Sequence, residues 1–245
     1  MTAKKRLDVL LLEKGLAPSR QKAQALILSG HVLVEDQPQS KPGHLVAESC
    51  SIRVRGAEHP YVSRGGVKLS AALEAFQIHP QGFIALDVGA STGGFTQVLL
   101  QRGAKKVHAI DVGHNQMAWE IRSDPRVVVQ EKLNARYLSF DQIGEHVDLI
   151  VIDVSFISLE KILPSLLQFA QLKTHWVALV KPQFEVGKGK LGKGGVVHSN
   201  ELRQEALEKV KSFAKNLGLH PLGLIESPIT GAEGNVEYLI HWKLS

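Results

Sequence analysis

Most of the chain alternates between short apolar runs and longer segments in which apolar residues recur every three or four positions. Runs of the first kind predict buried strands, and segments of the second kind predict helices. Strands are predicted at 84–87, 107–110, 127–129, 148–153 and 176–180, and helices at 95–102, 117–123, 159–169 and 200–217. Asn200 is the expected cap of the last helix, and Gly218 its end. The alternation predicts an α/β fold, a doubly wound parallel sheet with helices on both faces.

The two ends of the chain depart from this alternation. Strands predicted at 222–226 and 237–242 have no helix between them, so they should form an antiparallel hairpin. Near the other end, helices are predicted from 6 to 14 and from 19 to 29, and strands at 31–34 and 51–55. We therefore predict a small α+β domain at 1–58, a linker at 59–63 containing Pro60, and the α/β domain at 64–245.

Charge is unevenly distributed between these parts. Residues 1–64 hold ten Lys and Arg against six Asp and Glu, whereas the remaining 181 residues hold nineteen against eighteen. A basic excess confined to the first quarter favours a nucleic-acid-binding module attached to a nearly neutral body.

Composition excludes several classes of protein. Cys50 is the single cysteine, which excludes a disulfide framework and cysteine-based metal sites. The eleven histidines show no ligand spacing, so we expect no metal. No apolar run approaches the roughly 18 residues of a membrane helix. The N-terminal segment does not resemble a secretion signal, because Asp8 and Glu13 interrupt its apolar stretch. We therefore expect a cytoplasmic protein with no membrane partner.

The stretch IALDVGASTGGFTQV, residues 84–98, predicts a strand, a small-residue loop and a helix N-terminus. Glycines let a backbone approach a ligand closely, and free amides at a helix start bind ligand oxygens. A dinucleotide fingerprint requires a third-position glycine, where this loop has Ser91. Asp87 suits a cationic, hydroxylated ligand better than a pyrophosphate. The loop therefore favours S-adenosylmethionine over NAD, with a ligand-free tight connection as the alternative.

Charged residues follow four predicted strands: Asp87, Asp111, Asp153 and Lys181. Because ligands of such sheets bind beyond the carboxyl ends of the strands, all four should face one crevice. Asp111 lies where a carboxylate commonly holds ribose hydroxyls. Asn134 could recognise an adenine edge, although a turn-forming role is equally compatible with its position.

A second glycine-rich segment, VGKGKLGKGG at 186–195, resembles a phosphate-binding loop in its GxxxxGK spacing. Gly194 replaces the Ser or Thr that such a loop requires, and no strand leads directly into it. The segment is better interpreted as a mobile substrate loop than as an ATP site.

Residues Ser19 to Gln37, SRQKAQALILSGHVLVEDQ, resemble the S4 RNA-binding domain, which implies that Arg20 and Lys22 contact RNA phosphates. The whole chain is similar to the TlyA-type (hemolysin A) S4/FtsJ-like rRNA 2′-O-methyltransferases. This resemblance rests on SRGGVKL at 63, LDVGASTGGFT at 86, VDLIVIDVSFISL at 147, LVKPQFEVGKGK at 179 and GNVEY at 234. It implies a Rossmann-like seven-stranded methyltransferase sheet behind the S4-like domain.

The family resemblance also implies residue roles. The Lys-Asp-Lys-Glu tetrad of FtsJ-like enzymes falls on Lys68, Asp153, Lys181 and Glu237, with Lys181 as the base or hydroxyl-orienting group. Residues expected to bind S-adenosylmethionine are Asp87, Gly89, Ala90, Ser91, Thr92, Gly93, Gly94, Phe95, Asp111, Val112, Asn134 and Asp153. Residues expected to bind RNA are Lys4, Arg6, Arg20, Lys22, Arg64, Lys188 and Lys190.

The resemblance further implies that the partner is ribosomal RNA or a ribosomal subunit. Relatives with a C-terminal extension modify both subunits, and a chain ending at Ser245 implies a cytidine of the large-subunit rRNA. Two alternatives remain open: an RNA-binding protein without catalysis, and a membrane-active hemolysin-like protein.

Overall fold

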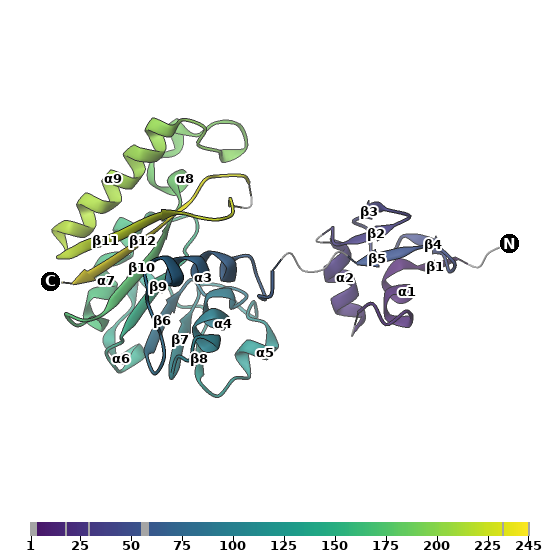
Figure 1. Ribbon diagram of the computed structural model, residues 1–245, viewed down its shortest axis with the longest axis horizontal. Coiled ribbons are helices and arrows are strands. Elements are labelled where there is room, and N and C mark those ends of the chain that lie inside the picture. The colour runs from purple at the N-terminus through teal and green to yellow at the C-terminus, as the bar shows by residue number, and fades with distance from the viewer. Residues whose placement is uncertain (1–3, 18, 29, 55–58, 232, 245) are drawn as a thin grey trace. The chain divides into compact units, whose positions relative to one another are not determined.

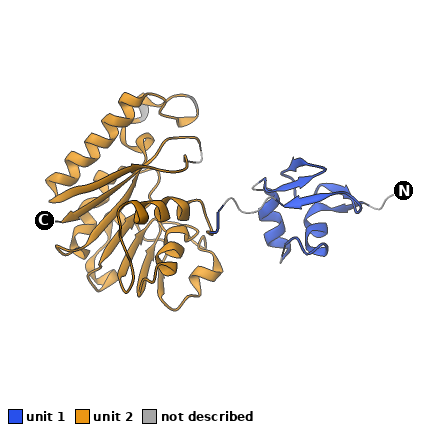
Figure 2. Ribbon diagram, viewed as in Figure 1, with its two compact units in different colours: residues 1–60 blue, residues 61–245 orange. Residues whose placement is uncertain are grey.

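The computed structural model describes residues 4–17, 19–28, 30–54, 59–231 and 233–244. Contacts divide the chain into two compact units, Met1–Pro60 and Tyr61–Ser245, referred to below as unit 1 and unit 2 (Figure 2). The linker expected at 59–63 stays a prediction, and residues 55–58 of the expected first domain lie outside the described residues.

Unit 1 combines two helices with short antiparallel strands (Figure 1). Its elements are β1 (Lys4–Arg6), α1 (Leu7–Glu13), α2 (Arg20–Leu28), β2 (Val32–Val34), β3 (Gln37–Gln39), β4 (Leu45–Ala47) and β5 (Ile52–Val54). Strand β2 pairs with both β3 and β5, and β1 pairs with β4. Leu7, Leu11 and Ile27 are fully buried and belong to one core that the helices share with the strands. The predicted α+β arrangement is therefore confirmed.

Within the described residues, unit 2 contains a seven-stranded sheet in the order β11-β12-β10-β9-β6-β7-β8 (Figure 1). Its strands are β6 (Ile84–Val88), β7 (Lys106–Ile110), β8 (Val127–Gln130), β9 (Leu149–Ile152), β10 (His175–Val180), β11 (Leu219–Glu226) and β12 (Tyr238–Leu244). Strands β6 to β10 pair in parallel, whereas β12 is antiparallel to both β10 and β11. The predicted hairpin is confirmed, and its second strand inserts between the first strand and the rest of the sheet.

Helices cover both faces of this sheet, because alternate residues of each strand point to opposite sides. The longer helices are α3 (Gly65–Ala75), α4 (Gly94–Gln101) and α9 (Asn200–Asn216), and the short ones are α5 (Trp119–Arg122), α6 (Phe140–Ile143), α7 (Leu163–Leu166) and α8 (Pro182–Glu185). One core joins α3, α4 and α5 to strand residues such as Ala85 and Val177. The other joins α6, α7 and α9 to residues such as Leu86 and Trp176. The predicted doubly wound α/β fold is confirmed.

Two local predictions were wrong. The segment 159–169, predicted as one helix, contains a 3₁₀ turn at Leu159–Lys161, then α7 and a second 3₁₀ turn at Leu167–Phe169. Pro164 lacks the N–H that a continuous helix would use. The cap of α9 is Ser199, whose hydroxyl accepts the Leu202 N–H at 3.2 Å, and Asn200 is already helical.

Candidate active site

The carboxyl ends of β6, β7, β9 and β10 lie side by side at one end of the sheet, which is called its carboxyl edge below. Asp87 lies in β6, Asp111 and Asp153 follow β7 and β9, and Lys181 follows β10. Parallel pairing fixes this placement, since Val88 is opposite both Ile110 and Ile152. The predicted gathering of these segments at one edge is therefore confirmed.

Asp87 does not face the crevice, so this part of the expectation was wrong. Its side chain is fully buried, and Oδ2 accepts a hydrogen bond from Thr96 Oγ1 at 2.6 Å. Burial raises the pKa of Asp87 to about 7, against the opposing effect of the Thr96 hydrogen bond. The carboxyl group therefore anchors the first turn of α4 beneath the glycine-rich loop.

The loop at 89–94 turns sharply from β6 into α4. Gly89 and Ala90 both donate their N–H to the Ile110 carbonyl, at 2.9 and 3.1 Å. Gly89 has φ +86°, and a Cβ there would lie 2.4 Å from the backbone oxygen of Asp153. Only glycine fits this close approach, which brings the loop against the end of β9.

Asp111 and Asn134, both expected to contact the donor, hold the backbone in defined turns. Asp111 accepts the N–H of Ser91 at 2.8 Å and that of Gly113 at 2.6 Å, so it joins the glycine-rich loop to the segment after β7. Asn134 Oδ1 accepts the Arg136 N–H at 3.0 Å and caps a 3₁₀ turn. The turn-forming role is thus present in Asn134, and its amide nitrogen is on an exposed residue.

Lys181 lies between an acidic and a hydroxyl partner. Its Nζ is 2.6 Å from Asp153 Oδ1 and donates to Ser155 Oγ at 2.9 Å. The lysine side chain is only 10% exposed. Both partners belong to the segment that follows β9, so the position of Lys181 Nζ is fixed by the neighbouring strand end.

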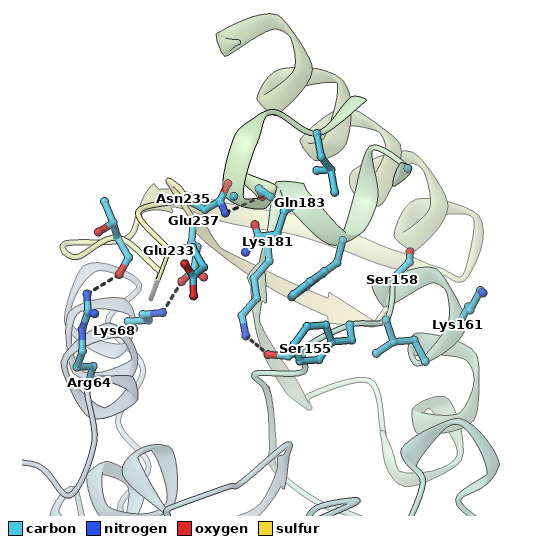
Figure 3. A pocket seen from close by; sticks show the side chains of 18 of the residues that line it. Arg64, Lys68, Ser155, Ser158, Lys161, Lys181, Gln183, Glu233, Asn235 and Glu237 are labelled. Carbon is cyan, nitrogen blue, oxygen red and sulfur yellow. Dashed lines mark hydrogen bonds and ion pairs between the residues drawn. The ribbon is translucent and has the colours of Figure 1, made fainter. Parts of the chain in front are cut away.

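Lys68 and Glu237 form a second pair, although they are 169 positions apart in the chain. Lys68 Nζ on α3 donates to Glu237 Oε2, and both side chains are less than a tenth exposed. Glu237 directly precedes β12, and the register places Tyr238 opposite Val180. The antiparallel course of β12 therefore brings Glu237 to the edge at which Lys181 lies (Figure 3).

A pocket of about 1010 Å³ opens at this edge. Its polar and charged lining residues are Arg64, Lys68, Arg136, Ser155, Ser158, Lys161, Lys181, Gln183, Thr230, Glu233, Asn235 and Glu237. Figure 3 shows Lys68 extending toward Glu237 and Lys181 toward Ser155 from different sides. Five cations against two carboxylates make the pocket suitable for an anionic substrate.

Three features of the pocket were missed at the level of sequence. Ser155 accepts a hydrogen bond from Lys181. Phe156 has a backbone φ of +64° and a side chain that is 91% exposed. Its ring centroid lies 5.2 Å from that of Phe184. Asn235 is buried, accepts the Val197 N–H at 2.9 Å and donates to the Gly195 carbonyl at 3.1 Å. Only the polar Ser155 beside Asp153, after a fully apolar strand, offered a local signal.

The residues expected to bind RNA lie in both units. Arg64 lines the pocket and donates from Nη2 to the Thr230 carbonyl at 2.6 Å. Lys190 pairs with Glu205, and the side chain of Lys188 lies outside the described part of the structure. In unit 1, Lys4 and Lys22 are exposed, whereas Arg6 and Arg20 pair with the buried Asp8.

Neither a metal cluster nor a membrane span is found in the part of the chain that the structure describes. Among those residues, no three His, Cys, Asp or Glu side chains gather in a way that would hold a metal ion. No helix there is both long and apolar enough to cross a bilayer.

Comparisons with known proteins agree with this architecture. The sequence model of FtsJ-like methyltransferases matches residues 61–244, and that of the S4 domain matches residues 5–49. The 16S/23S rRNA (cytidine-2′-O)-methyltransferase TlyA of Mycobacterium tuberculosis is 50% identical over 241 residues, 98% of this chain and 90% of the relative. The 23S rRNA (cytidine-2′-O)-methyltransferase TlyA of Campylobacter jejuni is 37% identical over 183 residues, 74% of this chain and 70% of the relative. A Streptococcus thermophilus structure solved under the name hemolysin has a TM-score of 0.77 and 41% identity, covering 100% of this chain and 90% of that one.

Proposed function

Because this chain belongs to the FtsJ-like methyltransferase family and carries an S4 domain, we propose that it methylates the ribose 2′-hydroxyl of a cytidine in ribosomal RNA. The names of both curated relatives include 23S rRNA, so we place the target in the large subunit. A ribosomal RNA or subunit as partner in turn places the protein in the cytoplasm. The observation that carries the proposal is the meeting of two lysine–carboxylate pairs at one pocket.

The residues at the carboxyl edge fit S-adenosylmethionine as the methyl donor. The close approach at Gly89 keeps the loop backbone free of side-chain atoms, and the start of α4 offers amides to a ligand carboxylate. Asp111 and Asp153 lie beside the loop and carry negative charge that suits a sulfonium cation. Bound there, the donor supplies an electrophilic methyl group and a neutral thioether as leaving group.

The tetrad accounts for what the protein must do to the ribose. The 2′-oxygen forms a bond to the methyl carbon while the carbon–sulfur bond breaks and its electron pair stays on sulfur. The hydroxyl proton must leave at the same time. Lys181 Nζ is held beside Asp153, where it orients that hydroxyl, and it accepts the proton after giving up one of its own to solvent. Asp153 then stabilises the ammonium group that forms. Lys68, fixed by Glu237, adds positive charge near the developing oxyanion.

The lining of the pocket suits an RNA strand around that ribose. Arg64, Arg136 and Lys161 can neutralise phosphates, which positions the strand without selecting its sequence. The exposed ring of Phe156, beside Phe184, offers a face on which a base can stack. Selection of one cytidine would then come from the shape of the RNA and from the S4 domain.

The test is transfer of a labelled methyl group from S-adenosylmethionine to large ribosomal subunits or 23S rRNA. Lys181→Ala should lower the single-turnover rate at least about 100-fold while leaving donor affinity within about twofold. Lys173→Ala is the matched control, because Lys173 is an exposed lysine that precedes β10 at the opposite edge of the sheet. Wild-type activity in Lys181→Ala would refute the role of this lysine.

The same assay separates the proposal from the two alternatives. Wild-type protein that binds S-adenosylmethionine and RNA but transfers no methyl group would be an RNA-binding protein without catalysis. Dye release from liposomes, in the absence of transfer, would support a membrane-active protein instead. Mapping of ribose methylation in the product RNA then identifies the nucleotide.

A further inference from the structure

A carboxylate lies buried beneath two arginines on unit 1. Asp8, in the first turn of α1, has no exposed surface. Arg6 binds it through Nε and Nη2, each at 3.0 Å from a different carboxylate oxygen. Arg20 Nε and Gln24 Nε2 also donate to it, at 3.0 and 2.8 Å. The Arg6 hydrogen bonds, helped by those of Gln24 and Arg20, hold the pKa of Asp8 well below its usual range.

The two arginines keep most of their binding capacity in this arrangement. Their side chains are 47% and 53% exposed, whereas Asp8 is covered. A guanidinium group has five N–H donors, of which Arg6 uses two and Arg20 one on Asp8. Two guanidinium charges and one carboxylate leave a net charge of about +1, which one phosphodiester group would neutralise.

We infer that Asp8 is a positioning residue that holds the guanidinium groups of Arg6 and Arg20 together as one binding site for a phosphodiester group of RNA. Without the shared carboxylate, two like charges would repel and the long side chains would sample many rotamers. Fixing them before RNA arrives lowers the entropic cost of binding. The inference rests on the proposed function, since it specifies how unit 1 binds the RNA substrate.

If Asp8 served only to hold β1, α1 and α2 together, its replacement would have a different effect on RNA affinity. Asp8→Asn removes one negative charge from a basic unit, so simple electrostatics predicts tighter binding to RNA. A positioning role predicts the opposite, because Arg6 and Arg20 lose the group that aligns them. The sign of the change in affinity therefore separates the two interpretations.

The experiment measures binding of the full-length protein to 23S rRNA by filter retention at several salt concentrations. Asp8→Asn should bind about tenfold more weakly. A plot of the logarithm of the association constant against the logarithm of salt concentration should become less steep by about one. Asp36→Asn is the matched control, since it removes the same charge from an 80% exposed position of unit 1 and should bind equally or more tightly. Affinity of Asp8→Asn equal to or above that of Asp36→Asn would overturn the inference.

Arg20→Lys provides a second test if Asp8→Asn fails to fold. It keeps the net charge but replaces the planar donor group, so affinity should fall by about five- to tenfold. Unchanged affinity would overturn the inference. Binding of S-adenosylmethionine, which depends on unit 2, should be unaltered in every variant. If wild type neither binds nor methylates RNA, the proposed function fails; if it does both and these variants match it, only this inference fails.

Discussion

The buried carboxyl group of Asp87 should make the free energy of unfolding of unit 2 decrease as the pH rises. Its side chain is fully buried, and its Oδ1 has no hydrogen-bond partner among the described residues. Burial is the main cause that raises its pKa from 3.8 to about 7, and the negative charges of Asp153 and Asp111 raise it further. Ionised Asp87 is therefore costly to keep inside the folded unit.

The sign follows from which state binds the proton. Between pH 3.8 and about pH 7, folded Asp87 keeps a proton that the unfolded chain releases, so stability falls as the pH rises through this range. Below the lower value both states are protonated and the penalty is absent. At about 1.4 kcal/mol for each unit of pKa difference, the loss amounts to about 4 kcal/mol at pH 8. Removing the charge should remove this part of the pH dependence.

The assay is urea unfolding of wild type and Asp87→Asn at pH 5, 6, 7 and 8, followed by tryptophan fluorescence. All three tryptophans, at 119, 176 and 242, lie in unit 2, so the signal reports on this unit alone. Wild type should lose stability relative to Asp87→Asn as the pH rises, whereas the exposed control Asp141→Asn should follow wild type. A difference between wild type and Asp87→Asn that stays constant across these pH values would refute the reasoning.

Three further outcomes are expected in unit 2. Gly89→Ala should abolish donor binding in calorimetry, because its Cβ would meet the Asp153 backbone oxygen at 2.4 Å in a positive-φ conformation. Lys68→Met should lower the free energy of unfolding by about 3–5 kcal/mol in urea, because it leaves Glu237 buried and unpaired. The double variant Lys68→Met, Glu237→Leu should recover this stability but not methyl transfer. Burial lowers the pKa of His241 from 6.5 to about 4, so the folded state resists protonation of this side chain. The free energy of unfolding should therefore be highest above pH 6.5 and fall by about 3 kcal/mol as the pH drops through 4. In urea unfolding, His241→Phe should lose less of it over this range.

The fold of unit 2 could be predicted because most strands of its parallel part are short apolar runs and its connecting helices are amphipathic. Three-residue strands such as β1 and β4 leave no such signal, since so short a segment shows no period. The helix predicted at 159–169 failed at Pro164, where backbone chemistry outweighed the apolar pattern. The apolar pattern therefore predicted the long elements correctly. It failed where a single residue determines the backbone hydrogen bonding.

The candidate site divides in the same way. The glycine-rich loop and Asp111 could be predicted because they are contiguous with the ends of two strands. The burial of Asp87 could not, since whether its carboxylate turns outward or toward α4 depends on Thr96 nine positions later. That Lys68 and Glu237 belong to one site was implied only by the family resemblance, because no local rule relates positions so far apart.

The position and direction of β12 bring the Lys68–Glu237 pair to the same site as the Lys181–Asp153 pair. Strand β12 runs opposite to β10, so its first residue, Tyr238, pairs with the last residue of β10, Val180. The next residue outward on each strand is then Glu237 on one side and Lys181 on the other. In a parallel β12 that began opposite His175, Glu237 would lie level with Thr174. That is about seven residues, or roughly 23 Å at about 3.3 Å per residue, from the level of Lys181. The antiparallel hairpin is therefore a requirement of the site and not only of the fold, because it places the acidic partner of Lys68 at the edge where Asp153 holds Lys181.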